Sequence, residues 1–354
     1  MRHRAHRGRA RGFVRIEAAA ILVVACVLLA VIAMLGAESR RQARLGDDIA
    51  NLQQIGAWTG SYAADNADLY WSFGWKKGHT QTQWPDLVAQ AQAGDREAQS
   101  AQAVDILRRQ AGRLDITPIV WFANARHSHL ALLDYLATLF PEAAFVSTMD
   151  KDLTKWARDP FGFDKGLYQP APSPPIGPGT NSGKRWPYAA SFQVPTVFFD
   201  RSPIGFRASQ SGLNHSTYSI PSQVQLGGQT RSAVAFPSAK VHVHDTHGRH
   251  FGTRVPYCIA DESRLPLLFA DESVVVRSAV EANPGWNPNS LTSVSPTNMI
   301  YAPDVWEPPV PGGAPSQPVI GRFRWTRGTA TEHGIAGRDF DGPETCSGQP
   351  GCLP

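Results

Sequence analysis

The chain has 354 residues, of which 42% are hydrophobic, enough for a sizeable core, and its formal net charge is +4. Five of its 34 basic residues lie in residues 1–12, which hold no acid, so the body carries 29 basic against 30 acidic residues. This balance excludes the basic surface typical of nucleic-acid-binding proteins, and we expect no nucleic-acid partner. The 31 glycines and 28 prolines predict a loop-rich body.

A basic leader and a long apolar segment open the chain. The leader, residues 1–12, is followed by Phe13, by Glu17 and then by the charge-free run Ala18–Ala37. A helix of that length spans the roughly 30 Å hydrocarbon core of a bilayer. A secretory signal has a shorter apolar region, of about 7–15 residues, and a small-residue cleavage site that Leu35–Glu38 match poorly. We therefore predict a single-pass membrane helix with a cytoplasmic N-terminus, because basic flanks stay in the cytoplasm.

The leader, the Gly12–Phe13 junction, Glu17 and the apolar helix together resemble the class III signal of type IV pilins and type II secretion pseudopilins. The resemblance implies cleavage by a prepilin peptidase after Gly12, methylation of Phe13, and assembly with other pilin or pseudopilin subunits. It also implies that Glu17 pairs with the Phe13 amino group of a neighbouring subunit. Carboxylates inside a membrane are rare and usually partnered, although Glu17 could instead reach the membrane edge. Arg15 departs from the small polar or apolar residue usual in this family.

The helical pattern continues beyond the membrane segment. Leu45, Ile49 and Leu52 recur at helical spacing, and the pattern ends near Asp65, which predicts one helix over residues 13–64. The expected fold is α+β and pilin-like, with this helix leading into a loop-rich antiparallel β-sheet head that has a helical insertion. We expect a helical part of the head over residues 65–158, a β-rich part over 159–345 and a tail over 346–354.

Within the head, helices are expected to be concentrated before about residue 145, and antiparallel strands are expected after about residue 185. The predicted helices begin at Ala103, in an Ala/Gln-rich stretch, and cover Ser128–Phe140, where Pro141 ends the pattern. The candidate strands are Tyr188–Val194, Val197–Phe199, Lys240–His244, Leu267–Ala270, Val274–Arg277 and Ile320–Thr326.

Several stretches of the body are similar to a large-bodied pseudopilin-like family, among them residues 188–194, 236–242, 266–274, 283–286 and 323–328. In the run Leu268–Val274, Glu272 replaces a turn glycine, which disfavours a tight type I′ hairpin. The resemblance implies a structural subunit of a type II secretion or type IV pilus-like system, anchored in the inner (cytoplasmic) membrane and in contact with its lipid. Its head would face the periplasm or the exterior, and we expect neither enzyme activity nor a cofactor.

The alternative function is that of a membrane-anchored extracytoplasmic enzyme or binding protein with a metal site. Strand alternation places His242 and His244 on one face, within reach of His247 and His250 after a turn, and imidazoles so placed can bind zinc. The run is similar to the H-x-H-x-D-H motif of the metallo-β-lactamase fold, but Asp245 comes one position early. We expect solvated histidines at a strand end and no tightly held metal.

The remaining candidate sites have weaker patterns. Residues 177–184 resemble a phosphate-binding loop, but Pro178 stands where the pattern requires glycine, and Arg185 follows Lys184 where it requires serine or threonine. Cys346 and Cys352 could form a disulfide outside the cytoplasm or be two free thiols. Two further sets of residues are interpreted as solvated surface acids rather than as a glycosidase-like cleft or a calcium site: Asp152, Asp159 and Asp164, and the tail acids Asp339, Asp341 and Glu344.

Overall fold

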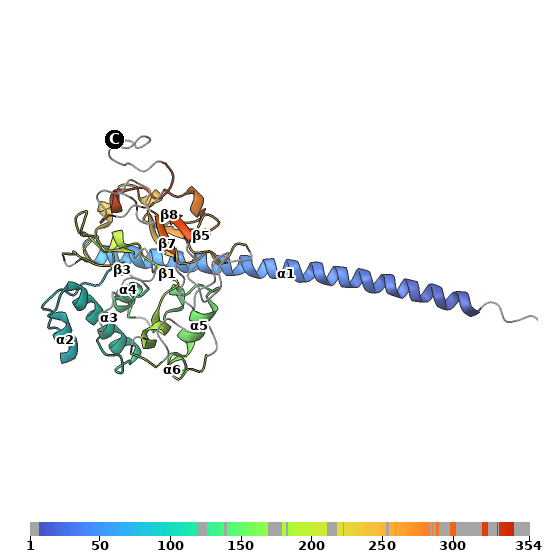
Figure 1. Ribbon diagram of the computed structural model, residues 1–354, viewed down its shortest axis with the longest axis horizontal. Helices are drawn as coiled ribbons and strands as arrows, with labels where there is room; N and C mark the ends of the chain where they lie inside the picture. The colour runs from blue at the N-terminus through green and yellow to red at the C-terminus, as the bar shows by residue number, and fades with distance from the viewer. Residues whose placement is uncertain are drawn as a thin grey trace, which may run out of the picture. The chain divides into compact units, whose positions relative to one another are not determined.

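The computed structural model describes residues 7–118, 126–137, 140–168, 179–181, 183–210, 218–221, 223–252, 255–258, 260–283, 285, 288–289, 298–301, 321–324, 331 and 333–342, with side chains from Glu17 onward. The chain divides into two compact units, Met1–Gly46 and Asp47–Pro354. The helix α1 (Arg7–Asp65) supplies residues to both (Figure 1). The architecture is broadly α+β, as predicted, with a long apolar N-terminal helix, shorter helices and a four-stranded antiparallel sheet.

The second half of α1 is amphipathic, and its apolar face belongs to the core of the second unit. Leu52 and Ile55 are fully buried, whereas the two residues between them are exposed. This spacing is that of a helix with one face on a core. Ala67 and Asp68 adopt φ values of 52° and 66°, in the left-handed region that commonly follows a helix end. α1 therefore covers the predicted helix over residues 13–64, but it begins earlier than predicted, at Arg7.

Residues 66–84 connect α1 to the next helix, and we call them the aromatic loop because they contain Tyr70, Trp71, Phe73 and Trp75. Three helices follow this loop. They are α2 (Pro85–Ala91), α3 (Asp95–Ala111) and α4 (His129–Leu136). The prediction that a helix begins at Ala103 was wrong, because α3 starts at Asp95, where acidic residues in the first turn favour a helix N-terminus. The prediction that α4 extends to Phe140 was also wrong, since Ala137 has a φ of 52° and leaves the helix.

Two further helices lie on either side of residue 159, where the β-rich part was predicted to begin. These are α5 (Lys151–Arg158) and α6 (Pro160–Asp164), preceded by a 3₁₀ turn over Ala143–Phe145. Asp150 caps α5 by accepting a hydrogen bond from the Leu153 amide at 3.2 Å, and Asp159 caps α6 through the Gly162 amide at 2.8 Å. α5 lies within the predicted helical part, residues 65–158, although it comes after residue 145, whereas α6 lies in the part predicted to be β-rich; capping aspartates start both helices.

The main sheet has the strand order β1-β4-β5-β6, and all of its neighbours are antiparallel. Its strands are β1 (Phe192–Gln193), β4 (Val241–Asp245), β5 (Arg264–Phe269) and β6 (Val274–Ser278). The predicted strands near residues 240, 267 and 274 are confirmed, whereas the one over 188–194 is reduced to β1. The prediction of a strand at Val197–Phe199 was wrong, because Thr196–Phe198 form a 3₁₀ turn.

Two small strand pairs complete the described β-structure. One joins β2 (Ser209–Gln210) to β3 (Tyr218–Ser219), and the other joins β7 (Asn298–Tyr301) to β8 (Gly321–Arg324). β8 falls within the strand predicted over residues 320–326. The other 3₁₀ turns are Gly183–Tyr188, Arg231–Ala233, Pro237–Ala239, Ala279–Glu281 and Gly334–Ala336.

The β5–β6 hairpin is tight and packs on bare backbone of α1. The Glu272 amide donates to the Phe269 carbonyl at 3.0 Å, and Glu272 takes a φ of 70°. This is a three-residue turn with a left-handed residue, rather than the type I′ turn considered from sequence. A Cβ atom at Gly56 would lie 3.1 Å from Leu268 Cδ1, and one at Gly60 would lie 2.8 Å from Glu272 Oε1. The two glycines of α1 therefore permit the close approach of the hairpin.

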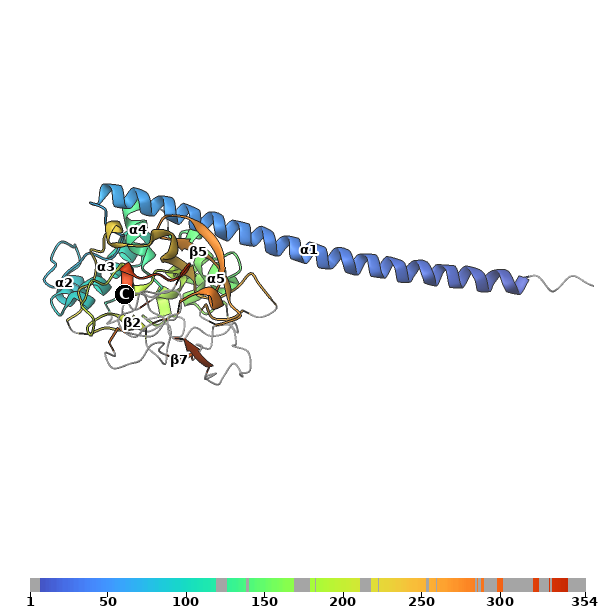
Figure 2. The same cartoon turned by 90° about the horizontal axis from the view of Figure 1, so that it is seen from above.

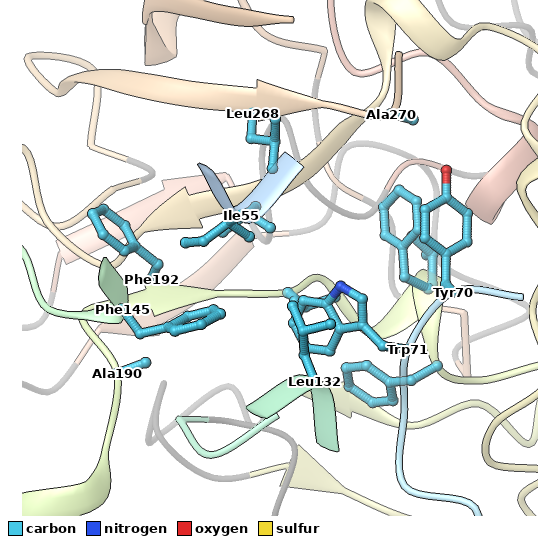
Figure 3. Packing of buried hydrophobic residues seen from close by; sticks show 14 of the residues in the cluster. Ile55, Tyr70, Trp71, Leu132, Phe145, Ala190, Phe192, Leu268 and Ala270 are labelled. Atoms are coloured by element: carbon cyan, nitrogen blue, oxygen red, sulfur yellow. The ribbon is translucent and has the colours of Figure 1, made fainter. Parts of the chain in front are cut away.

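The main hydrophobic core joins α1, α4, the sheet and the aromatic loop after α1. Figure 3 shows Ile55 of α1 with Leu268 of β5 on one side and Leu132 of α4 and Trp71 on the other. The Trp71 indole N–H donates to Thr59 Oγ1 at 2.9 Å, which satisfies a buried donor. Both views show the last turns of α1 beside α4 and β5 (Figures 1 and 2). The second half of α1 thus contributes side chains, such as Leu52 and Ile55, to the core of the second unit.

Candidate functional site

The first candidate site is the N-terminal part of α1. Within the described chain, α1 is the helix whose length and composition are sufficient to cross a membrane. Its apolar side chains are strongly exposed, with Ile21 at 69% and Leu35 at 66%. Glu17 is also exposed, and the described residues offer it no ion-pair or hydrogen-bond partner. Gly12 and Phe13 lie in the helical backbone of α1, but their side chains are outside the described part.

The second candidate site is the histidine run around β4. The expectation of solvated histidines was wrong: His242, His244, His247 and His250 are all buried, with exposures between 1% and 6%. The four imidazoles also have separate surroundings. His242 packs against the rings of Tyr70 and Phe198, with centroids 4.8 and 4.7 Å away. Among the described residues, no group of three or more His, Cys, Asp or Glu side chains is arranged to hold a metal.

His250 belongs to a buried polar contact with α1. Its Nε2 lies 2.7 Å from Asp48 Oδ2, and neither side chain is more than 1% exposed. Asp48 also accepts hydrogen bonds from Ser147 Oγ at 2.5 Å and from the Thr148 amide at 2.8 Å. Because Ser147 donates to the aspartate rather than to the imidazole and is fully buried, this trio lacks an accessible nucleophile. Its geometry instead fixes α1 to the loop before α5.

A second set of charges continues this contact. Arg249 lies 2.9 Å from Asp150 Oδ2 and 3.2 Å from Asp245 Oδ1. Asp150 also accepts a hydrogen bond from Ser191 Oγ at 3.0 Å. We call Asp48, Asp150, Asp245, Arg249 and His250 the buried charge cluster. It joins α1, the start of α5, the end of β4 and the turn that follows. Removing one partner from such a cluster leaves a buried charge uncompensated.

Burial controls the protonation of these groups. It raises the pKa of Asp245 to about 6, although the neighbouring Arg249 opposes this shift. Burial works against the charge on Arg249, but Asp150 and Asp245 outweigh it and raise the pKa of the guanidinium. Burial lowers the pKa of His242 to about 3 and that of His244 to about 4. The two β4 histidines are therefore neutral packing groups at neutral pH.

Three of the acids interpreted from sequence as solvated surface groups, Asp159, Asp164 and Asp339, have structural roles, whereas Asp152 lies only 4.0 Å from the exposed Lys155 and Glu344 is outside the described residues. Asp164 accepts a hydrogen bond from the buried Arg113 at 2.6 Å, and Asp159 caps α6. The interpretation of Asp339 as part of a solvated tail was wrong: it is fully buried, 2.9 Å from Lys240 Nζ. Asp341 is exposed and pairs with Arg277. These acids are thus held by intramolecular partners.

Two other predicted sites lie wholly or partly beyond the described residues. Cys346 and Cys352 are outside them, so the choice between a disulfide and free thiols stays open. Of the phosphate-loop-like residues 177–184, positions 177, 178 and 182 are outside as well. In the described part of the chain, the cysteines Cys26 and Cys258 are free thiols.

A pocket that the sequence analysis did not anticipate lies between α1 and α5. It encloses about 620 Å³. Asp47 and Asn51 form its α1 wall, Ala157 and Arg158 form its α5 wall, and Glu142 lies at the connecting loop. We call it the α1–α5 pocket. No sequence signal marks it, because its walls come from three segments that only the fold brings together.

The comparisons with known proteins give no relative: no family model, no curated protein and no solved structure matches this chain.

Proposed function

We propose that the chain is a pilin-like structural subunit of the pseudopilin type, which assembles through α1 into a pilus or pseudopilus of a type II secretion or type IV pilus-like system. The observation that carries the proposal is the start of α1. There a Gly12–Phe13 junction and a lone carboxylate, Glu17, precede a run of apolar side chains that the monomer leaves exposed. On this proposal the chain acts by assembly and not by catalysis.

The exposed apolar face of α1 needs a nonpolar environment. Exposed apolar surface costs about 25 cal/mol per Å², so a run such as Ile21–Leu35 is stable only against lipid or other apolar helices. A plain anchor would be satisfied by lipid alone. Glu17 adds a requirement, since a carboxylate in the apolar layer calls for a cationic partner. The amino group that cleavage creates at Phe13 of a neighbouring subunit supplies one.

The basic leader supports a definite orientation. Its five arginines favour a cytoplasmic N-terminus in the inner membrane, which places the second unit in the periplasm or outside the cell. The expected partners are a prepilin peptidase, other pilin or pseudopilin subunits, and membrane lipid. The alternative of an enzyme or binding protein with metal at His242–His250 has no supporting observation, because the described residues include no group of three or more His, Cys, Asp or Glu side chains placed to hold a metal.

The proposal is tested by the mass and N-terminal sequence of the chain isolated from its native membrane. We expect it to begin at N-methylated Phe13. Gly12→Val should abolish this cleavage, whereas Gly8→Val, a control inside the leader, should leave it intact. A native chain that begins at Met1, or after Ala37, would contradict the proposal.

A further inference from the structure

The α1–α5 pocket combines an apolar floor with charged walls. Pro141, Ala143 and Val146 form the loop side, and Ala50 and Ala157 contribute small side chains from α1 and α5. The polar lining groups are Asp47, Asn51, Glu142, Thr148, Thr154 and Arg158. At about 620 Å³ the pocket has room for several side chains of a polypeptide, within the usual range of binding sites.

Among the residues that the structure describes, the charges on the pocket walls have no partner of opposite charge. In the part of the chain that the structure describes, neither Asp47 nor Arg158 contacts an oppositely charged side chain, although both line one pocket. Glu142 uses one oxygen to accept a hydrogen bond from the Ala144 amide at 3.2 Å and has no cationic partner there. Two carboxylates and one guanidinium thus face a shared space, which favours a ligand that is mainly cationic but carries one acid.

We propose that this pocket receives the segment Glu38–Arg44 of α1 from a second copy of the chain. The segment carries three arginines, at positions 40, 41 and 44, and one acid, Glu38. Glu38 and Arg41 are exposed at 56% and 38%, and they lie 3.7 Å apart. This charge pattern is the complement of the pocket: the arginines match Asp47 and Glu142, and Glu38 matches Arg158. The other side chains of the segment, from Ser39, Gln42 and Ala43, are small or polar.

This pairing rests on the proposed function, in which copies of the chain assemble through α1. Because a guanidinium sits at the end of a long flexible side chain, the arginines of the segment can reach carboxylates on the pocket walls.

The test uses the full-length chain in its native membrane, with the photo-crosslinking residue p-benzoylphenylalanine at Ala157 in the pocket. We expect a crosslinked dimer in which mass spectrometry maps the attachment to Glu38–Arg44 of the other copy. The matched control carries the same residue at Lys155, which lies on α5 but outside the pocket lining, and should give little of this product. Attachment to another segment, to lipid or to another protein would overturn the inference.

Two differently tagged chains then test the charge pairing. Asp47→Lys or Arg44→Asp alone should weaken the Ala157 crosslink about fivefold, the equivalent of roughly 1 kcal/mol for one exposed ion pair. Co-expression of an Asp47→Lys chain with an Arg44→Asp chain should restore it between the two tags. A failure to restore it would contradict direct pairing.

Assembly is scored separately, by a bis-maleimide crosslink through Cys26 in the apolar part of α1. A Cys26 dimer without the Ala157 dimer would overturn the pocket inference and leave the proposed function standing. Loss of both would overturn both.

Discussion

Nε2 of His250 lies 2.7 Å from Oδ2 of Asp48, across 202 positions of sequence and without solvent access to either side chain. This contact ties the second half of α1 to the turn after β4. The rest of the buried charge cluster extends the connection, through Asp150, to the start of α5 and to Ser191, which directly precedes β1. In a subunit that assembles through α1, these contacts would keep the second unit attached to the helix.

The first prediction concerns this attachment. Asp48→Ala should lower the free energy of unfolding of the second unit by about 3–5 kcal/mol, because it leaves His250, Ser147 and the Thr148 amide without their shared acceptor. Denaturant unfolding of the full-length chain in detergent measures the change. Asp47→Ala is the matched control, since Asp47 is exposed, and it should stay within about 0.5 kcal/mol of wild type. Equal effects of the two variants would contradict the structural role of Asp48.

The second prediction is that acid destabilises the fold through its buried histidines. The pKa of His242 has an ordinary value of 6.5, and burial lowers it to about 3 in the folded chain. Its contribution to stability is therefore present above pH 6.5 and is lost as the pH falls from 6.5 toward 3, by about 1.4 kcal/mol per pH unit. His129, whose pKa burial also lowers to about 3, acts with the same sign.

Asp245 has the opposite sign, because its folded pKa of about 6 lies above the ordinary 3.8 and its contribution increases as the pH falls between those values. The measurement is urea unfolding of His242→Gln between pH 7 and 5. As the pH falls, the free energy of unfolding of this variant should decrease less steeply than that of wild type. The difference in slope should be about 1.4 kcal/mol per pH unit, the value for one proton. An unchanged slope for His242→Gln would count against the buried, neutral imidazole.

The parts of the fold with local sequence signals were predicted well. A charge-free run followed by a 3.6-residue period predicts α1, and the strands β4, β5 and β6 come from β-branched and apolar runs separated by turn residues. Helix boundaries were less accurate, since they depend on single residues such as Ala137, whose φ of 52° is set by its surroundings. The run at Val197–Phe199 looked like a strand, but it packs as a 3₁₀ turn.

The candidate site could be predicted only in part. The N-terminal motif is contiguous, so the sequence displays it directly. The environments of His242, Asp48 and Asp339 depend on residues far along the chain, such as Lys240, which lies 99 positions from Asp339. The polar run over residues 242–250 was therefore interpreted as solvated, although its histidines are buried. The sequence did contain one signal of a distant partner: Asp48 has helical spacing from Leu45 and Leu52, and an acid on the core-facing side of a helix is seldom buried without a partner.

The third prediction concerns the hairpin on α1. Gly56→Leu should destabilise the second unit by about 1–3 kcal/mol, because even a Cβ there would lie 3.1 Å from Leu268 and the larger side chain must displace the β5–β6 turn. Gly46→Ala is the contrasting change, since nothing lies within 4 Å of its Cβ, and it should stabilise α1 by about 0.5–1 kcal/mol. Thermal unfolding monitored by circular dichroism separates the two. A Gly56→Leu chain as stable as wild type would show that the hairpin does not rest on this face.

The last prediction concerns assembly through Glu17. This carboxylate precedes the charge-free run Ala18–Ala37, and the next acid is Glu38. An unpaired carboxylate in the apolar layer of the membrane costs several kcal/mol, so we expect a neighbouring subunit to supply a cation. In the proposed filament, that cation is the amino group of Phe13 of an adjacent subunit. Glu17→Ala should therefore leave membrane insertion and cleavage intact but abolish incorporation into the filament. If Arg15 pairs with Glu17 within one chain, Arg15→Thr should improve assembly. Co-expression with the cognate machinery tests both variants, with cleavage scored by mass and assembly by crosslinking through Cys26. If Glu17→Ala chains crosslink as efficiently as wild type, Glu17 has no role in subunit contact and the filament proposal loses its main physical support.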